Sequence, residues 1–217
     1  MIRNVLFDWS GTLVNDLPAV WRATNYTFTQ SGYPEMSLEE FRSKFSLPFD
    51  EFYERVAPGV PLQQLEKWYK LGFAVEQKTI ELLPFAEDFF SFCKSKHLRT
   101  FLLSTIHPDH YREQSARIAF DFDHVYVRVM DKRVRIAQIL KEQNLLAEET
   151  MFIGDMQHDV ETAYAGGIHS CAVLTGYNSR EQLEEAEPEL IVEHLGELGE
   201  ILKESGMEWP APVSANE

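Results

Sequence analysis

The sequence has few cysteines and no long hydrophobic run. Only two of its 217 residues are cysteine, Cys93 and Cys171, and their spacing gives neither a disulfide framework nor a cysteine metal site. Each lies in an apolar stretch, which predicts a small buried side chain. No run approaches the ~18 apolar residues of a membrane span, and the first residues lack the architecture of a signal peptide. We therefore expect a cytoplasmic protein without a membrane partner.

Positive charge is also scarce. Lysine and arginine number 20 against 35 aspartates and glutamates, which gives a net charge of −15 with histidine neutral. Such a charge repels nucleic acid backbones and anionic lipids, so we expect no nucleic acid partner. Any phosphate site must be built locally against this field. The composition, with 44% hydrophobic and 25% charged residues, is that of a globular protein, and we expect a monomer or a homodimer.

Short apolar runs of strand length end at polar or turn-forming residues. The predicted strands are residues 5–7, 101–103, 125–127, 151–153 and 171–174, with a short edge strand at 191–192. Helical patterns lie between them, and the clearest consists of Ile136, Ile139, Leu140 and Leu145. From residue 84 onward, strands and helices alternate. This alternation predicts an α/β fold with a parallel sheet covered on both faces.

The first and second predicted strands are far apart in the sequence. The pattern of the intervening stretch predicts several consecutive helices, and the stretch is rich in aromatic residues. We therefore predict an all-helical domain, residues 16–81, inserted after the first strand of a core domain made of residues 1–15 and 82–217. The connections would lie near residues 14–17 and 82–84. From Trp209 to Pro212 we expect a loosely held tail.

Polar residues follow several of the predicted strands. In an open parallel sheet, ligands bind at the carboxyl ends of the strands. The residues at these positions are Asp8, Ser10, Ser104, Thr105, Lys132, Asp155 and Asp159. Three of them, Asp8, Asp155 and Asp159, are carboxylates that can together hold a hard divalent cation, for which Mg²⁺ is the natural choice. The sequence therefore predicts a magnesium site.

The remaining polar residues suit phosphoryl transfer. Lys132 and the metal would neutralise a phosphoryl group and keep Asp8 ionised as a nucleophile. The hydroxyls of Ser104 and Thr105 can donate hydrogen bonds to phosphoryl oxygens, and such electrostatic positioning supplies most of the catalysis. Simpler interpretations remain open: Asp155 and Asp159 could only cap a helix, and Lys132 could be one of several solvated bases.

These segments, in this order, resemble a known family. The residues that carry the resemblance are Phe7-Asp8-x-Ser10-Gly11-Thr12-Leu13, Ser104, Lys132, and Gly154-Asp155-x-x-x-Asp159. The sequence resembles the haloacid dehalogenase superfamily, and the inserted helices resemble the cap of its phosphoglycolate-phosphatase-like members. The resemblance implies a Rossmann-like core, a helical cap that closes over a small phosphorylated metabolite, and an aspartyl-phosphate formed on Asp8.

The same resemblance assigns roles to the site residues. It implies that Mg²⁺ is held by Asp8, the backbone carbonyl of Ser10, and Asp155 with support from Asp159. It also implies that Ser104 and Lys132 bind the phosphoryl group. Phosphatases of this family place a second aspartate two residues after the nucleophile, as the general acid and base. Here that position is Ser10, whose hydroxyl has a pKa too high for this task. Such a group is typically worth about 10²–10⁴-fold in rate.

Three hypotheses follow from Ser10. The first is a phosphatase whose acid is supplied by another group, with His107 and His158 as candidates, or whose substrate has a good leaving group. The second is a phosphonoacetaldehyde-hydrolase-like enzyme that cleaves a C–P bond, with Lys44 as the Schiff-base lysine. The third is a non-catalytic relative that binds a phosphorylated ligand or a protein. The retained carboxylates and lysine favour the first.

Overall fold

The computed structural model of the chain describes residues 1–210. Its main sheet has six parallel strands in the order β5-β4-β1-β6-β7-β8. The strands are β1 (Asn4–Phe7), β4 (Arg99–Leu103), β5 (His124–Tyr126), β6 (Thr150–Gly154), β7 (His169–Val173) and β8 (Leu190–Val192). The predicted α/β fold with a parallel sheet is confirmed, and each predicted strand overlaps an observed one.

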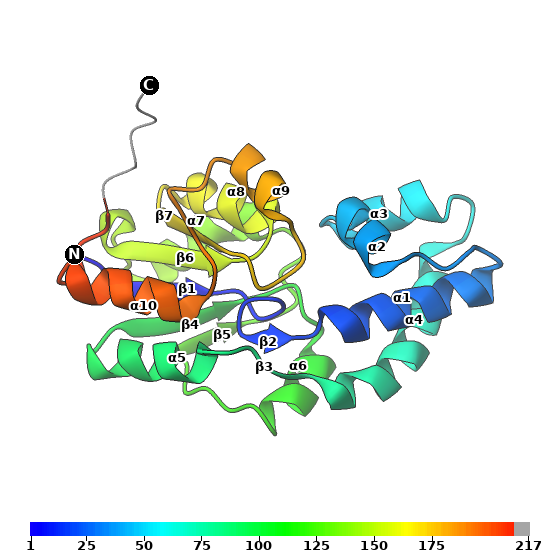
Figure 1. The fold of residues 1–217 in the computed structure, drawn as a ribbon, viewed down its shortest axis with the longest axis horizontal. Helices are drawn as coiled ribbons and strands as arrows, with labels where there is room; N and C mark the ends of the chain where they lie inside the picture. Colours follow the sequence, from blue (N-terminus) through cyan, green and yellow to red (C-terminus); the bar gives the residue numbers. More distant parts are fainter. Residues whose placement is uncertain (211–217) are drawn as a thin grey trace.

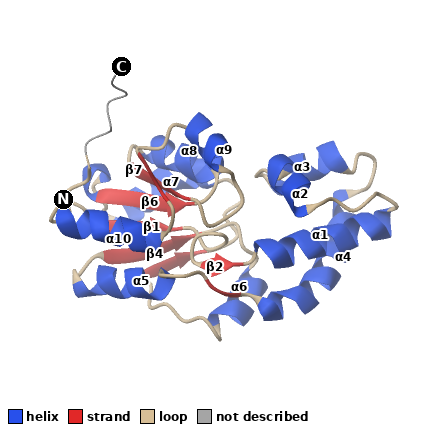
Figure 2. Cartoon of the chain, viewed as in Figure 1, coloured by secondary structure: helices blue, strands red, loops and turns tan. Residues whose placement is uncertain are grey.

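Helices cover both faces of this sheet (Figure 2). They are α5 (Ala86–Ser95), α7 (Lys132–Gln143), α8 (Gln157–Gly166), α9 (Arg180–Glu185) and α10 (Leu195–Glu204), with a short 3₁₀ turn, η2, at Ala147–Glu149. A further helix, α6 (Pro108–Ser115), follows β4 and contacts residues 77–79 beyond the sheet. Side chains alternate along β1, since Leu6 packs in one apolar cluster with Ile136 of α7 while Phe7 packs in another with Phe89 of α5. Because successive strand residues point to opposite faces, a strand buried on both sides reads as a continuous apolar run.

The helix α7 ends earlier than the apolar pattern predicts. Ile136, Ile139 and Leu140 lie within it, but Leu145 does not. Asn144 adopts a left-handed conformation, with φ of 52°, that terminates the helix, and the N–H of Leu145 then donates to the carbonyl of Leu140. This arrangement is a common helix ending that places an apolar side chain back against the helix. Leu145 therefore packs in the same apolar cluster as Ile136 and Ile139, although it lies beyond the end of the helix.

A group of helices lies beside the carboxyl ends of the strands, at the right of Figure 1. They are α1 (Leu17–Ser31), α2 (Leu38–Lys44), α3 (Phe49–Val56) and α4 (Leu62–Glu76), followed by the 3₁₀ turn η1 (Gln77–Thr79). We call residues 16–81 the helical insert. The chain enters and leaves it through an antiparallel pair of two-residue strands, β2 (Val14–Asn15) and β3 (Glu81–Leu82). The sequence predicts connections near residues 14–17 and 82–84, and the division into two domains stays a prediction.

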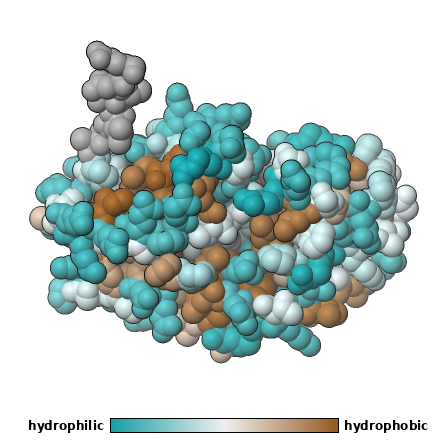
Figure 3. Space-filling view, viewed as in Figure 1, coloured by the Kyte–Doolittle hydropathy of each residue, from teal (hydrophilic) through white to brown (hydrophobic). Residues whose placement is uncertain are grey.

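The surface, the two cysteines and the last described residues complete the description of the fold. Hydrophilic residues cover most of the face shown in Figure 3, with hydrophobic patches between them. No helix within residues 1–210 combines the length and hydropathy needed to cross a bilayer. Both Cys93 and Cys171 are buried, as predicted. The predicted tail lies outside the described residues from residue 211 onward, but Trp209 stacks on His169 with ring centroids 4.9 Å apart, so that prediction was wrong for Trp209.

Candidate active site

Three buried carboxylates meet at the carboxyl edge of the sheet. Asp8 follows β1, Asp155 follows β6, and Asp159 lies in the first turn of α8. The strands β1 and β6 are neighbours, with Phe7 paired to Ile153, so the residues that follow them emerge side by side. One carboxylate oxygen from each of the three residues lies within 4.8 Å of the others, and all three residues are buried. The sequence-predicted cluster is therefore assembled by adjacent parallel strands.

Lys132, the first residue of α7, is the cation of this cluster. Its side chain is fully buried, and Nζ lies 2.8 Å from Oδ1 of Asp8 and 2.7 Å from Oδ1 of Asp159. Burial lowers the pKa of Lys132, but the charges of Asp159 and Asp8 outweigh burial and raise it overall. The ammonium therefore stays charged between the two carboxylates. The interpretation of Lys132 as a solvated surface base is wrong.

Asp159 has two roles in the structure. Its Oδ1 accepts from Lys132, while its Oδ2 accepts hydrogen bonds from the backbone N–H groups of Asp155 and Met156 at 3.2 and 3.1 Å. The second set stabilises the start of α8, because helix N-termini have unpaired N–H donors. The capping role considered from sequence is therefore real for Asp159, and the lysine contact exists beside it.

Asp155 is held by two loops. Oδ1 accepts from the hydroxyl of Thr12 at 3.2 Å, and Oδ2 accepts from the backbone N–H of Tyr177 at 2.7 Å. Gly11 and Gly176 approach so closely that a β-carbon on either one would overlap the Asp155 carboxylate, and Gly11 has a φ of 67°. Glycine is required where the backbone must lie against another group in a left-handed conformation. The loops after β1 and β7 thus enclose Asp155.

The charge balance of this cluster suits a divalent cation. Burial raises the pKa of Asp8, with Lys132 opposing and Asp159 adding to the effect. Burial, together with the charges of Asp159 and Asp8, raises the pKa of Asp155 well above its usual range. Three buried carboxylates face a single ammonium, so a further positive charge is needed to keep all three ionised. Carboxylate oxygens are the ligands that Mg²⁺ prefers, and the residues present fit it.

The two predicted hydroxyls lie on the neighbouring strand. Ser104 is buried directly after β4, which pairs with β1 on the side away from β6. Its Oγ accepts a hydrogen bond from the backbone N–H of Ile106 at 3.3 Å, which leaves the hydroxyl hydrogen available to another acceptor. Thr105 is half-buried beside it. Ser104 therefore follows the strand next to β1, as the sequence predicted, and its role in binding a phosphoryl group stays a prediction.

The histidine candidates have structural roles in this arrangement. His107 is the N-cap of α6, and its Nδ1 accepts from the backbone N–H of Asp109. His158 is buried, its Nε2 accepts from the backbone N–H of Lys132 at 3.3 Å, and burial lowers its pKa to about 4. A histidine that is neutral near pH 7 and faces the backbone of Lys132 supports the loop that carries the lysine.

Two buried residues near the cluster, Asp16 and Tyr177, were not assigned by sequence analysis. Asp16, only 2% exposed, precedes α1. Burial raises its pKa to about 7; a hydrogen bond from Ser10 opposes the increase and the charge of Asp8 adds to it. The hydroxyl of Tyr177 donates to Oδ1 of Asp16 at 3.2 Å. No spacing signals this contact, because Asp16 reads in the sequence as an ordinary helix-capping aspartate.

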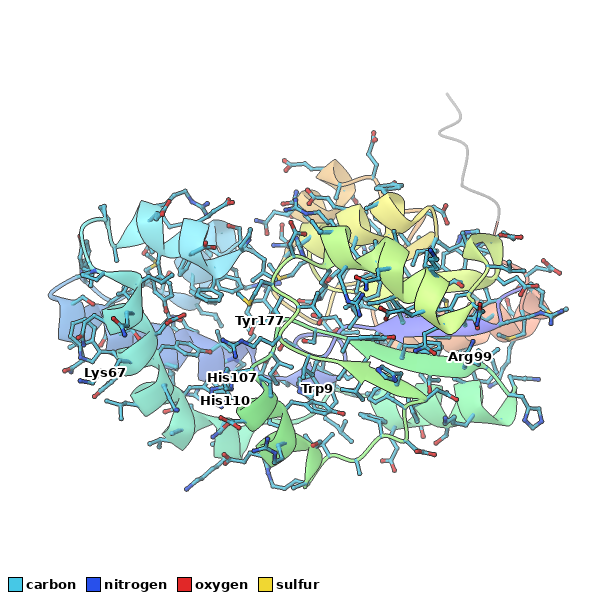
Figure 4. The ribbon with its side chains drawn as sticks, turned by 180° about the vertical axis from the view of Figure 1, so that it is seen from behind. Trp9, Lys67, Arg99, His107, His110 and Tyr177 are labelled. Carbon is cyan, nitrogen blue, oxygen red and sulfur yellow. The ribbon has the colours of Figure 1, made fainter. Side chains whose placement is uncertain are left out.

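Tyr177 also joins the core to the helical insert. Figure 4 shows it at the junction between the sheet and the insert. Its ring packs against Phe45 with centroids 5.1 Å apart, and Arg42 of α2 donates from Nε to the Tyr177 carbonyl at 3.0 Å and from Nη2 to that of Asn178 at 3.3 Å. The insert therefore lies against the loop that binds Asp155.

The fold matches solved structures over nearly the whole chain. A haloacid dehalogenase-like hydrolase from Streptococcus pneumoniae has a TM-score of 0.83 at 21% identity, covering 93% of this chain and 98% of that one. A predicted phosphatase from Clostridium acetobutylicum also has a TM-score of 0.83, at 19% identity, covering 94% of this chain and all of that one, 100%. At such identities the likeness establishes the fold.

Sequence comparison extends this likeness to curated relatives. A phosphoglycolate phosphatase from Synechococcus elongatus is 24% identical over 199 residues, covering 88% of this chain and 93% of that protein. A 5′-nucleotidase from Pseudomonas aeruginosa is 24% identical over 217 residues, covering 92% and 95%. The family model described as haloacid dehalogenase-like hydrolase matches residues 5–173, which run from β1 to the end of β7 and include every residue of the carboxylate cluster. The chain therefore belongs to the haloacid dehalogenase-like hydrolase family.

Proposed function

We propose that this hydrolase is a Mg²⁺-dependent phosphatase that acts on a small phosphorylated metabolite through Asp8. The observation that carries the proposal is the buried ammonium of Lys132, which lies within 2.8 Å of both Asp8 and Asp159 in a cluster of three carboxylates. A buried lysine beside an aspartate nucleophile is suited to neutralise an incoming phosphoryl group. The relatives with phosphatase names support the same reaction class.

The proposed reaction proceeds in two displacements at phosphorus. A carboxylate oxygen of Asp8 forms a bond to phosphorus while the bond from phosphorus to the alcohol oxygen breaks, and the leaving oxygen takes its proton from a water molecule. Water then attacks the phosphorus of the aspartyl-phosphate, which releases phosphate and restores the Asp8 carboxylate. Throughout, Lys132 and the hydroxyl of Ser104 stabilise the phosphoryl oxygens.

The metal and the helical insert have supporting roles in this proposal. Asp8, Asp155, the backbone carbonyl of Ser10 and Asp159, in support, would hold Mg²⁺, which supplies positive charge to the phosphoryl oxygens when bound. Residues 16–81 act as a cap on a core made of residues 1–15 and 82–217, and their contact with Tyr177 excludes water from the site.

The other two hypotheses are weaker. A Schiff-base lysine must be neutral and close to the substrate, whereas the Lys44 side chain is 47% exposed and its Nζ contacts Glu40 at 2.6 Å. A Schiff-base lysine needs a desolvated pocket, and the exposed, ion-paired Lys44 has none, so its position does not favour C–P bond cleavage. A non-catalytic protein has no need to bury Lys132 between two carboxylates, since burying charges is costly.

The first test is hydrolysis of p-nitrophenyl phosphate and a panel of sugar and acid phosphates, with Mg²⁺ and with EDTA. The p-nitrophenolate group leaves without a proton, so this ester reports on Asp8 and the metal without the general acid. We expect turnover that requires Mg²⁺ and disappears in Asp8→Asn. The exposed Asp88 on α5 gives a matched control, Asp88→Asn, which should retain turnover. Absence of turnover on every ester with folded, Mg²⁺-bound protein contradicts the proposal.

The role of Ser10 is tested separately. If loss of the second aspartate limits the rate, Ser10→Asp should raise hydrolysis of alkyl phosphates by about 10²-fold or more, the lower end of what general acid catalysis contributes. The same change should affect p-nitrophenyl phosphate far less. A fall in alkyl phosphate hydrolysis would show that the Ser10 hydroxyl has a role of its own.

A further inference from the structure

The loop that follows β7, residues 175–178, binds the carboxylate cluster on one of its sides. The backbone N–H of Tyr177 donates to Oδ2 of Asp155 at 2.7 Å. The hydroxyl of Thr175 donates to the carbonyl of Gly11 at 2.7 Å, which ties this loop to the one after β1. A hydrogen bond from an outer group fixes the orientation of a metal-binding carboxylate and raises its affinity for the metal. The conformation of this loop therefore decides how the Asp155 carboxylate is oriented.

Arg42 of α2 binds the same loop from the helical insert. Its Nε donates to the carbonyl of Tyr177 at 3.0 Å, and its Nη2 donates to the carbonyl of Asn178 at 3.3 Å. A guanidinium presents its donors in a rigid planar fork, so two successive carbonyls bound to one fork are held in a defined orientation. The Tyr177 ring also packs against Phe45, with centroids 5.1 Å apart. The insert therefore contacts the residue whose N–H binds Asp155.

A single peptide group connects Arg42 with the backbone of Asp155. The carbonyl of Tyr177 accepts from Arg42, and the N–H of Asn178, in the same peptide group, donates to the Asp155 carbonyl at 3.4 Å. Because a peptide group is planar, fixing the direction of its carbonyl also fixes the direction of its N–H. The side chain of Asn178 accepts from the N–H of Gln157 at 2.8 Å, at the start of α8. A displacement of α2 that breaks the Arg42 bonds therefore releases groups that orient Asp155.

The position of α2 against the core depends on few contacts. Within residues 1–210, the hydrogen bonds that join α2 and α3 to the core are the two made by Arg42. Other side chains of these helices bond inside the insert, as when Arg55 donates to the carbonyl of Lys44 at 3.0 Å. The chain enters and leaves the insert through β2 and β3, which have two residues each. Arg42 and the ring of Tyr177 therefore carry the docking of α2.

We propose that Arg42 is a positioning residue that couples the docking of α2 against the core to the binding of Mg²⁺ at Asp155. The inference rests on the proposed Mg²⁺-dependent function and concerns a residue that has no role in the chemistry of that proposal. When α2 is docked, Arg42 fixes Tyr177 and Asn178, and these two residues orient Asp155. Coupling between two sites is reciprocal, so bound Mg²⁺ also holds α2 more tightly against the core.

Isothermal titration calorimetry with Mg²⁺ measures this coupling without any turnover. We expect Arg42→Ala to raise the Kd for Mg²⁺ at least about fivefold, the lower end of typical coupling between sites. The loss of a positive charge would by itself lower that Kd, because it removes repulsion of the cation, so the direction of the change separates positioning from charge. Arg42→Lys should give an intermediate Kd, since an ammonium donates to carbonyls but lacks the planar fork. An unchanged or lower Kd in Arg42→Ala overturns the inference.

Arg55→Ala is the matched control for this titration. It also removes a guanidinium that donates to a backbone carbonyl, but that carbonyl belongs to Lys44 of the insert itself. The Kd of Arg55→Ala for Mg²⁺ should therefore not rise above that of the wild type. A rise equal to that of Arg42→Ala would show that loss of any arginine of the insert weakens the metal site, which would overturn the assignment to Arg42.

Hydrogen–deuterium exchange tests the reciprocal effect on the insert. In the wild-type protein, Mg²⁺ should slow amide exchange in α2 (Leu38–Lys44), and in Arg42→Ala this effect should disappear. Should Arg42→Ala fail to fold, the wild type alone decides, because exchange in α2 that does not respond to Mg²⁺ overturns the inference. A wild-type protein that binds no Mg²⁺ overturns the phosphatase proposal as well, whereas Mg²⁺ binding that is independent of Arg42 overturns this inference alone.

Discussion

Asp16→Asn should stabilise the protein, and by an amount that depends on pH. Burial raises the pKa of Asp16 from its ordinary value of 3.8 to about 7. A carboxyl whose pKa is raised on folding binds a proton more tightly in the folded state. Its contribution to the free energy of unfolding is fully present below about pH 4 and is lost as the pH rises through about 7. Above that pH the wild-type protein must fold with an ionised, buried Asp16.

The size of this penalty follows from the change in pKa. The increase amounts to about three pH units, and each is worth about 1.4 kcal/mol, so ionised Asp16 costs about 4 kcal/mol of unfolding free energy above neutral pH. Asparagine carries no charge, and its side-chain carbonyl can still accept from the hydroxyl of Tyr177. We therefore expect the stability advantage of Asp16→Asn to grow by about 2–3 kcal/mol between pH 5 and pH 8.

Urea unfolding in EDTA, followed by tryptophan fluorescence at several pH values, measures this difference. EDTA removes the contribution of bound metal, and the other carboxylates are common to both proteins. Asp88→Asn is the matched control, because its side chain is exposed and its stability difference should not depend on pH. A difference in unfolding free energy between wild type and Asp16→Asn that is constant from pH 5 to pH 8 would refute the reasoning. It would mean that Asp16 stays ionised on folding without a penalty.

Three further changes test other parts of the site. Mg²⁺ should raise the Tm of the wild-type protein in proportion to the logarithm of its concentration above Kd, and Asp155→Asn should abolish that rise in a thermal melt. Lys132→Met leaves Asp8 and Asp159 unpaired in the interior, and urea unfolding at pH 8 should show a loss of about 3–5 kcal/mol. Arg42→Ala removes the bonds to two backbone carbonyls, and the same assay should show a loss of about 1–3 kcal/mol, whereas an unchanged stability would mean that the insert does not depend on this contact.

The sequence predicted most of the architecture of the core. Strands buried on both faces, such as 5–7 and 151–153, appear as continuous apolar runs, and a parallel sheet follows from their alternation with helices. The parallel arrangement also requires that residues following neighbouring strands meet, which is why Asp8 and Asp155 could be assigned to one site. The end of α7 could not be predicted from periodicity, because Leu145 contacts the same core from beyond the left-handed Asn144.

Burial and long-range contacts depended on the tertiary structure. The pattern Lys132-Arg133-x-Arg135 reads as a basic surface, but the position of α7 beside Asp8 and Asp159 buries the first residue completely while the two arginines stay half-exposed. Asp16 and Tyr177 are 161 residues apart, and they meet because α1 begins beside the loop that follows β7.

The sequence by itself therefore determined the strands, their parallel arrangement and the carboxylates at their ends, because these follow from local hydrophobic pattern and from the geometry of parallel sheets. Only the tertiary structure decided that Asp16 turns away from its own helix toward Tyr177, and that Arg42 of the insert donates to backbone carbonyls of the core. Those contacts depend on where the helical insert lies against the sheet, and that position is determined by packing between segments remote in the chain.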